Sequence, residues 1–303
     1  MSENKKIFAT PKIRKFAREL GANISEIEGS ARSGRITEED VKNFVNKNLN
    51  KPKAKKEAHV KSEFNHSDFG DVEIIDMSRV KRLAAPHLSN SWNTIPHVTH
   101  HDEVDITELE DFRAKLTDTV SGDKIKITPL AFIAKALTNN LKKFPTFNSS
   151  IDNIKDGKIT LKKYFHIGIA VDTPHGLMVP KIRNVDQMKI KEIAEELKNV
   201  SELSRNLKIN KKEFFGGSIT ITSLGGIGGT YFTPIINYPE VAILGVGRSY
   251  KKQIFIKDKF LARTVLPISL SYDHRIIDGA EAAKFCNLLK ENLGKNFAYN
   301  LAF

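Results

Sequence analysis

Apolar and polar residues alternate with helical spacing in two short stretches near the N-terminus. The first stretch follows Thr10 and Pro11, a pair that caps a helix and begins its first turn. Its apolar face consists of Ile13, Phe16, Ala17 and Leu20. The second stretch begins at Thr37, and Asp40 stands three residues later as in a capping box. These patterns predict a very small helical domain over residues 7–45.

A Lys- and Asn-rich stretch comes next. From Asn46 to about His66 the chain has few large apolar residues, and its lysines repel one another. This composition predicts an extended linker, which we place at residues 46–71. We prefer solubility to nucleic-acid binding as the role of its lysines.

From Val72 onward, segments with helical and strand periodicity alternate, which predicts an α/β domain over residues 72–303. Helices are expected at 106–116, 129–143 and 189–206, and after Gly279. Strands are expected at 164–171, 217–223, 241–246 and 265–273. In the first of these helices we expect a capping box of Thr107 and Glu110, with Phe112 facing inward.

The charge leaves several kinds of partner open, whereas the lengths of the apolar runs and the cysteine count exclude several classes of protein. The net charge is +12, and residues 1–56 hold 14 Lys and Arg against seven Asp and Glu. A basic surface suits nucleic acid, an anionic membrane or an acidic protein, although it is more often simply solvated. No apolar run reaches the roughly 18 residues of a membrane span, and no signal-peptide core is visible. The single cysteine, Cys286, excludes an internal disulfide framework and fits a reducing, intracellular compartment.

The segment SYDHRIIDG, residues 271–279, carries the strongest chemical signal. His274 follows a strand in which apolar residues alternate, and Asp278 comes four residues later at a Gly turn that opens a helix. A histidine at a strand end can act as a general base, because its pKa lies near working pH. A lone histidine is more often structural, but this spacing favours a functional one.

A glycine-rich loop follows the strand 217–223. It matches neither a Walker A sequence nor GxGxxG, so nucleotide binding is weakly supported. Its glycines let backbone approach a bound thiol or another subunit. Thr222 and Ser223 at the strand end can donate a hydroxyl hydrogen bond to an oxyanion.

Three histidines, His97, His100 and His101, suggest a metal cluster at first sight. On a strand His97 and His101 share one face, whereas His100 points to the other. No further ligand pair is apparent, so we expect no metal site. Cys286 lies on the apolar face of the last helix and is expected in the core rather than as a nucleophile.

Several long motifs together carry a family resemblance. They are IFATPKIRKFARELGANISEIEGSARSGRITEEDVKNFV, MSRVKRLAAPHLSNSWNTIPHVTHHDEVDIT, VDTPHGLMVPKIR, ITSLGGIGGTYFTPIINYPEVAILGVG and SYDHRIIDG. In this order they resemble the dihydrolipoyl acyltransferase components of 2-oxo acid dehydrogenase complexes, most closely the pyruvate dehydrogenase branch. Residues 7–45 resemble the family's peripheral-subunit-binding domain, and residues 72–303 resemble its catalytic domain. GSARSGR replaces the family's commoner GTGxxGR, and Pro86 stands in a segment that is usually helical.

The resemblance implies a chloramphenicol-acetyltransferase-like catalytic domain, with a mixed sheet and flanking helices. It implies transfer of an acetyl group from acetyl-dihydrolipoyl to coenzyme A, with His274 as base, Thr222 as oxyanion donor and Asp278 as second active-site residue. Asp278 is expected to pair with an arginine, for which we select Arg79. Coenzyme A is then a substrate, and no metal takes part. The family's lipoyl domain is not seen before residue 7, so the lipoyl group is expected on another chain or on a missing N-terminal domain.

The resemblance also implies partners. Homotrimers are expected to assemble into a cubic or icosahedral cage, with each active site between two subunits. Arg14 and Arg35 match positions that grip the pyruvate decarboxylase component or dihydrolipoyl dehydrogenase. No nucleic acid or membrane is expected as a partner, and the location is expected to be the bacterial cytoplasm. Two alternatives remain for the function: transfer of a branched-chain acyl or succinyl group, and a non-catalytic core protein.

The C-terminal tail is apolar, with Phe297, Tyr299, Leu301 and Phe303, and it is expected to anchor neighbouring trimers.

Overall fold

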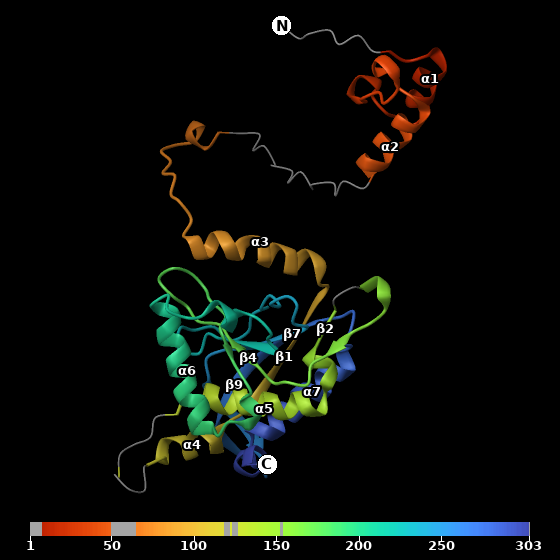
Figure 1. The fold of residues 1–303 in the computed structure, drawn as a ribbon. Helices are drawn as coiled ribbons and strands as arrows, with labels where there is room; N and C mark the ends of the chain where they lie inside the picture. Colours follow the sequence, from red (N-terminus) through yellow and green to blue (C-terminus); the bar gives the residue numbers. More distant parts are fainter. Residues whose placement is uncertain (1–7, 50–64, 118–121, 123–126, 152–153, 303) are drawn as a thin grey trace. The chain divides into compact units, whose positions relative to one another are not determined.

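A computed structural model of the chain divides into two compact units, Met1–Ile74 and Ile75–Phe303, each considered by itself below. Residues described by the structure are 8–49, 65–117, 122, 127–151 and 154–302 (Figure 1). None of the described helices is long and apolar enough to cross a membrane. Of the predicted linker at 46–71, residues 50–64 lie outside the described part of the chain.

The first unit contains two helices, α1 (Pro11–Glu19) and α2 (Glu38–Leu49). Thr10 caps α1 as predicted, and the left-handed φ of +67° at Gly21 lets the chain leave the helix. The connection contains η1 (Ile24–Glu26) and η2 (Arg32–Gly34), and η3 (His66–Asp68) follows α2 later in the unit. The buried core of this unit consists of Ala17, Ile27, Ile36 and Val41. Leu20, which we expected inside, is exposed because it lies at the C-cap, beyond the last helical turn.

The second unit is built on a mixed seven-stranded sheet. Its strands are β1 (His97–Asp105), β4 (Ile167–Ile169), β5 (Lys181–Ile182), β6 (Ile219–Ser223), β7 (Ala242–Val246), β8 (Tyr250–Ile256) and β9 (Lys259–Asp273). The order is β1-β9-β7-β6-β4-β5, and β8 pairs with β9 beyond this path. The strand β6 is parallel to both β4 and β7, whereas the remaining pairs are antiparallel. A separate ribbon pairs β2 (Ser149–Ser150) with β3 (Thr160–Leu161).

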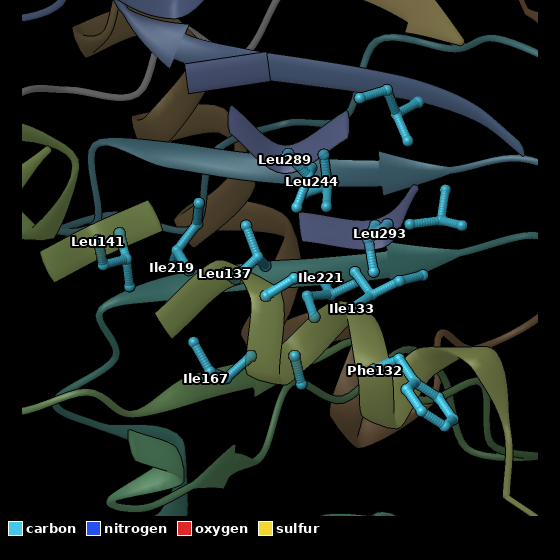
Figure 2. Packing of buried hydrophobic residues seen from close by; sticks show 14 of the residues in the cluster. Phe132, Ile133, Leu137, Leu141, Ile167, Ile219, Ile221, Leu244, Leu289 and Leu293 are labelled. Carbon is cyan, nitrogen blue, oxygen red and sulfur yellow. The ribbon is translucent and has the colours of Figure 1, made fainter. Parts of the chain in front are cut away.

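Helices bury one face of this sheet. The helices of the unit are α3 (Arg79–Thr94), α4 (Thr107–Lys115), α5 (Pro129–Lys143), α6 (Ile190–Arg205), α7 (Gly279–Leu293) and α8 (Phe297–Ala302). Short 3-10 turns are η4 (Pro145–Asn148), η5 (Ile154–Asp156), η6 (Val185–Gln187) and η7 (Lys211–Phe214). Figure 2 shows Leu137 of α5 and Leu289 of α7 packed with Ile219, Ile221 and Leu244 of the sheet. The predicted mixed sheet with flanking helices, preceded in the sequence by a small helical domain, is confirmed.

The opposite face of the sheet carries several polar side chains, and we call it the loop face because Phe232 and Ile236, from the loop before β7, contact it. Strand alternation directs Ile219 and Ile221 into the helical core, and therefore Thr220 and Thr222 toward the loop face. On β9, Ser269 and Ser271 lie on this same face, where they bond to His101 and Thr99 of β1. The candidate residues of β6 therefore lie on the loop face.

Two local predictions were wrong, and one hairpin had no prediction. Thr107 does not cap α4: its hydroxyl donates to the carboxylate of Asp105 and accepts from the amide of Thr264, so it fastens β1 to β9. Phe112 is exposed to 42%, although its ring lies against Phe297. The hairpin of β8 and β9 was not anticipated. Its turn at Lys257 and Asp258 has two positive φ values, as in tight hairpin turns.

The apolar tail docks locally at two of its four positions. Phe297 and Leu301 of α8 are buried in the core of their own unit. The backbone carbonyl of Asn300 accepts a hydrogen bond from Asn139 of α5. Tyr299 is exposed, and Phe303 lies outside the described residues. The expectation that the tail as a whole reaches a neighbouring trimer is therefore wrong for Phe297 and Leu301, because the unit's own core already covers them.

Candidate active site

His274 lies immediately after β9, and its backbone is fixed on both sides. Its amide donates to the carbonyl of Pro96 at 3.1 Å, and the amide of Asp273 donates to the carbonyl of Val241 at 2.8 Å. The side chain is exposed, and its ring lies 5.9 Å from that of Tyr272. An exposed imidazole on a fixed backbone can exchange a proton with a bound molecule.

An ion pair that we did not anticipate flanks His274. The carboxylate of Asp273 is buried and accepts hydrogen bonds from Nε and Nη2 of Arg275, at 2.8 and 2.5 Å from its two oxygens. The hydrogen bonds that Arg275 donates to Asp273 raise the pKa of the Arg275 guanidinium. The sequence Asp273-His274-Arg275 could have predicted this ion pair, because opposite charges two residues apart can stabilise a turn. The pair stiffens the loop that presents His274.

Asp278 is the N-cap residue of α7. One carboxylate oxygen accepts the amide of Glu281 at 2.8 Å, which satisfies one of the free donors at the helix start. The predicted Gly turn that opens a helix is therefore present. The selected partner, Arg79, is the exposed first residue of α3, and no hydrogen bond or ion pair joins it to Asp278 among the described residues.

Thr222 lies near the end of β6 on the loop face and is partly exposed. Its neighbour across the pair of strands is Gly245 of β7. A methyl group at Gly245 would come within 2.8 Å of the ring of Phe232, so glycine is needed for this ring to lie over Gly245. Ser223, the next residue, is exposed and lines a cavity of about 370 Å³ together with Gly225, Gly226 and the start of α5.

Strand register separates Thr222 from His274 within one chain. Thr222 pairs with Gly245, and Gly245 pairs with Ser269 of β9. His274 follows five residues after Ser269, and a strand rises about 3.3 Å per residue, so the two residues lie roughly 16 Å apart along the strands. One chain therefore does not bring these two candidate groups together.

Residues 224–236, which we call the glycine-rich segment, are fastened to β1 through Tyr231 and to β9 through the amide of Phe232, which donates to the hydroxyl of Ser269. Glu103 of β1 accepts hydrogen bonds from the hydroxyls of Tyr231 and Tyr250 and from the ammonium of Lys252. These bonds, with Lys252 the largest contributor, lower the pKa of Glu103. Partial burial and the bond to Glu103 raise the pKa of Tyr231 to about 12. Glu103 was missed because a lone carboxylate on a strand carries no sequence signal.

The histidines of β1 have separate partners. Nδ1 of His101 shares a hydrogen bond with the hydroxyl of Ser269, 2.9 Å away, and the His101 ring lies beside the ring of Tyr231. His97 bonds to Ile95 and Ile236 on either side. His100 approaches Asp102 at 3.9 Å. Among the described residues, no three His, Cys, Asp or Glu side chains are arranged to hold a metal ion.

A buried ion pair joins the loop before β7 to the sheet. Nζ of Lys181 lies 2.5 Å from the carboxylate of Glu240, and the hydroxyl of Thr220 donates to the same carboxylate at 2.6 Å. Asn237 adds a third hydrogen bond to Glu240. Because these hydrogen bonds compensate the buried charges, the ion pair holds the loop that follows the glycine-rich segment. A β-carbon at Gly217 would clash with Glu240, so glycine is needed there.

The remaining predicted residues lie apart from this centre. Arg14 and Arg35 are exposed on the first unit, and Nε of Arg14 donates to the carbonyl of Ala9. Cys286 is fully buried in α7, and burial raises the pKa of its thiol to about 12. The prediction that Cys286 is a core residue is confirmed.

Comparison with known proteins places both units. The pattern described as 2-oxoacid dehydrogenases acyltransferase (catalytic domain) matches residues 69–299, and that of the e3 binding domain matches residues 7–42. The dihydrolipoyllysine-residue acetyltransferase component of the pyruvate dehydrogenase complex from Cupriavidus necator is 46% identical over 291 residues. That match covers 91% of this chain and 52% of the relative. The corresponding Haemophilus influenzae component is 41% identical, with 93% and 52% covered. The chain spans about half the length of these two curated relatives.

Solved structures agree with this placement. A structure of Azotobacter vinelandii dihydrolipoamide acetyltransferase is 42% identical, with a TM-score of 0.75. It covers 80% of this chain and 98% of its own chain. That study concerns a serine, a histidine and an asparagine in the catalytic mechanism of the Azotobacter protein. The cubic core of a pyruvate dehydrogenase multienzyme complex matches with the same score, identity and shares covered.

The fold and the matched patterns define an acyltransferase catalytic domain that follows an e3 binding domain. The chain belongs to the 2-oxoacid dehydrogenase acyltransferase family, and the resemblance drawn from its motifs is confirmed.

Proposed function

We propose that the chain transfers an acetyl group from an acetyl-dihydrolipoyl thioester to coenzyme A and forms the structural core of a pyruvate dehydrogenase complex. The observation that carries this proposal is His274, an exposed imidazole whose backbone is held by Pro96 and whose loop is clamped by the pair of Asp273 and Arg275. The acetyltransferases matched at 46% and 41% identity support acetyl as the acyl group.

His274 acts as the general base. Its neutral imidazole takes the proton from the coenzyme A thiol, and the thiolate attacks the acetyl carbonyl carbon. The carbon–sulfur bond to dihydrolipoyl then breaks, and the departing sulfur receives the proton from the imidazolium. Acetyl-coenzyme A and free dihydrolipoyl are released, and His274 returns to its neutral form.

Thr222 stabilises the tetrahedral intermediate. The hydroxyl makes no hydrogen bond to another described residue, so it can donate to an oxyanion. Phe232, packed over Gly245, borders the same position and limits water. Ser223 supports this role from the next position, at the rim of its cavity.

Asp278 shapes the loop between His274 and α7. The Azotobacter study includes an asparagine in catalysis, and an asparagine side chain can cap a helix as an aspartate does. Aspartate and asparagine can therefore both accept the amide of Glu281 and hold the start of α7. Pairing of Asp278 with Arg79 belongs to the proposal only as a contact between subunits.

The complete site lies between two chains. The separation of roughly 16 Å between Thr222 and His274 is too large for both to act on one carbonyl within a chain. We place His274 from one subunit opposite Thr222 from the next, in a homotrimer that assembles into a cubic or icosahedral cage. Support comes from the match to a cubic core and from exposed apolar residues in and before α3. The most exposed of these in the second unit are Ile75, Leu83 and Trp92.

Coenzyme A and the dihydrolipoyl group are substrates in this proposal, and no step uses a metal. The lipoyl group arrives on another chain or on a domain outside this sequence. The domain limits that we propose are 7–45 for partner binding, 46–71 for the linker and 72–303 for catalysis and core formation. The bacterial relatives support a location in the bacterial cytoplasm.

The function is tested by an acyl-transfer assay with coenzyme A. Acetyl-dihydrolipoamide should be used much faster than branched-chain acyl- or succinyl-dihydrolipoamide. Preference for a larger acyl group would reassign the substrate. No transfer from any donor by assembled protein would leave the alternative of a non-catalytic core protein.

The first unit binds the decarboxylase component or dihydrolipoyl dehydrogenase through Arg14 and Arg35. The match to the e3 binding domain supports this role, as do the exposed positions of both arginines. Arg35→Glu should weaken binding in calorimetry, and the affinity of the unaltered chain should fall as salt rises. Binding that is insensitive to both changes would remove this basic face from the contact.

A further inference from the structure

His97 is the first residue of β1, and both nitrogens of its ring are in use. Nε2 lies 3.0 Å from the backbone nitrogen of Ile236, and Nδ1 lies 2.8 Å from the carbonyl oxygen of Ile95. A backbone N–H can only donate, so Nε2 must accept. The proton of the neutral ring is then on Nδ1, where it donates to the carbonyl of Ile95. These two contacts select one tautomer of the uncharged imidazole.

The two hydrogen bonds join parts of the chain that carry different halves of the proposed site. Ile95 directly precedes Pro96, whose carbonyl accepts the amide of His274. Ile236 ends the glycine-rich segment, which begins directly after Ser223. Ile95 and Ile236 are buried and pack with Ile243 in a small cluster of their own. The His97 ring therefore bridges the backbone support of His274 and the far end of the segment beside Thr222.

His101, the other histidine on this face, has a different role. It bonds to Ser269 and lies beside Tyr231, in the middle of the glycine-rich segment. It has no bond to the Ile95–Pro96 connection in the described part of the chain. Only His97, of the two, reaches both the segment and the support of His274.

We propose that His97 is a positioning residue for acyl transfer, acting through Pro96 on His274 and through Ile236 on the glycine-rich segment. This inference rests on the proposed function. His97 is placed to act through backbone groups rather than on the reacting atoms. A displacement of about 1 Å at a catalytic group can cost on the order of 100-fold in rate. Loss of His97 should therefore lower kcat more than it changes the KM for coenzyme A.

Two variants separate a positioning role from general destabilisation. His97→Leu removes both hydrogen bonds of the ring. His97→Gln places an amide oxygen near the position of Nε2, so it can still accept from the amide of Ile236. His100→Leu is the matched control, because His100 lies on the same strand but points to the other face, toward Asp102.

The experiment combines kinetics with amide hydrogen exchange on the assembled full chain. His97→Leu should lower kcat by about ten- to a hundred-fold, with the KM for coenzyme A changed by less than about threefold. Exchange in a peptide spanning residues 232–240 should become faster. His97→Gln, which keeps the acceptor for Ile236 but lacks the donor to Ile95, should restore the slow exchange and part of kcat. His100→Leu should match the unaltered chain in both properties.

Each measurement can overturn the inference. Unchanged kcat in His97→Leu would remove the positioning role, and exchange that His97→Gln does not slow again would remove the hydrogen bond from Ile236 as its cause. Unchanged exchange over residues 232–240 would show that the ring does not hold this segment. The exchange arm also separates two failures: if the unaltered chain transfers no acyl group, the proposed function fails, whereas exchange still tests the tether. If His97→Leu does not assemble, His97→Asn, which loses the acceptor for Ile236 but keeps a donor for Ile95, takes its place. It should show the faster exchange over residues 232–240 and a smaller loss of kcat.

Discussion

His274 owes its position to main-chain contacts, and its ring is exposed. Its amide is held by Pro96, its neighbour Asp273 is held by Val241, and Arg275 closes the turn. A side chain presented in this way can be truncated without opening a core cavity. Changes at His274 should therefore report on chemistry rather than on folding.

Replacing His274 by alanine should lower kcat for acetyl transfer by two or more orders of magnitude, because the proton acceptor is lost. The oligomer should remain intact in sedimentation, since no buried contact is removed. His100→Ala, at another partly exposed histidine of the same unit, should keep its activity. Near-normal turnover in assembled His274→Ala protein would assign the base elsewhere.

Thr222→Val replaces a hydroxyl by a methyl group of similar size. An oxyanion donor is commonly worth about 3–4 kcal/mol in the transition state, so kcat should fall by about 100- to 1,000-fold. The KM for coenzyme A should change little, because the bond forms to the transition state. Thr222→Ser, which keeps the hydroxyl, is the matched control and should retain most activity. Equal kcat in the Val and Ser variants would exclude Thr222 from the mechanism.

The start of α2 shows how one carboxylate can stabilise an element in a very small unit. Asp40 accepts the amides of Ser30 and Thr37 at 3.0 and 2.9 Å, and its own amide donates to the hydroxyl of Thr37. The predicted capping box is confirmed, and it also ties the preceding loop to the helix. The bonds from the amides of Ser30 and Thr37 lower the pKa of Asp40 to about 2.

Asp40→Asn should reduce the local free energy of unfolding near residues 30–41 by about 1 kcal/mol at neutral pH. Because the pKa in the folded state is about 2, below the ordinary 3.8, the charged carboxylate stabilises the fold above pH 3.8. That contribution is lost as the pH falls through about 2, so the difference between the unaltered chain and the Asp40→Asn variant should close over this range. Amide hydrogen exchange near residues 30–41 measures this difference in unfolding free energy. Glu39→Gln, which removes a neighbouring charge in the first turn of α2, is the control. A difference that does not vary with pH would exclude the charge as the cause.

At the level of the assembled oligomer, the site should be shared between subunits. Chains with His274→Ala and chains with Thr222→Val should each be nearly inactive alone. In trimers formed from an equal mixture, a site draws His274 and Thr222 from different chains, so about a quarter of the sites should have both native residues. Mixed refolding should therefore recover about a quarter of the native activity.

The control is a mixture of the two variants that are assembled separately and combined without refolding. It should show no recovery, because no chains are exchanged. If refolded mixtures also stay inactive, His274 and Thr222 serve the same chain's site, and the shared site is wrong.

Local patterns in the sequence were sufficient for most elements. The stretch 129–143 was predicted with its observed limits, and Thr10 and Asp40 were recognised as capping residues because capping depends on neighbours only a few positions away. The candidate residues His274 and Thr222 were likewise found from motifs contained within a few residues. The burial of Cys286 followed from helical periodicity alone.

Contacts between distant segments were decided only by the tertiary structure. The carboxylate of Glu103 meets Tyr231 and Lys252, and Nζ of Lys181 meets Glu240, across separations that no local pattern encodes. Thr107 was assigned to a helix cap because its local pattern fits one, but a strand 157 residues away provides a better use for its hydroxyl. Likewise, the sequence shows that Phe297 and Leu301 are apolar, but it does not show that they pack in the core of their own unit. Hydrophobic burial is not directional, so a pattern shows that a side chain will be buried, and only the packed fold determines against what.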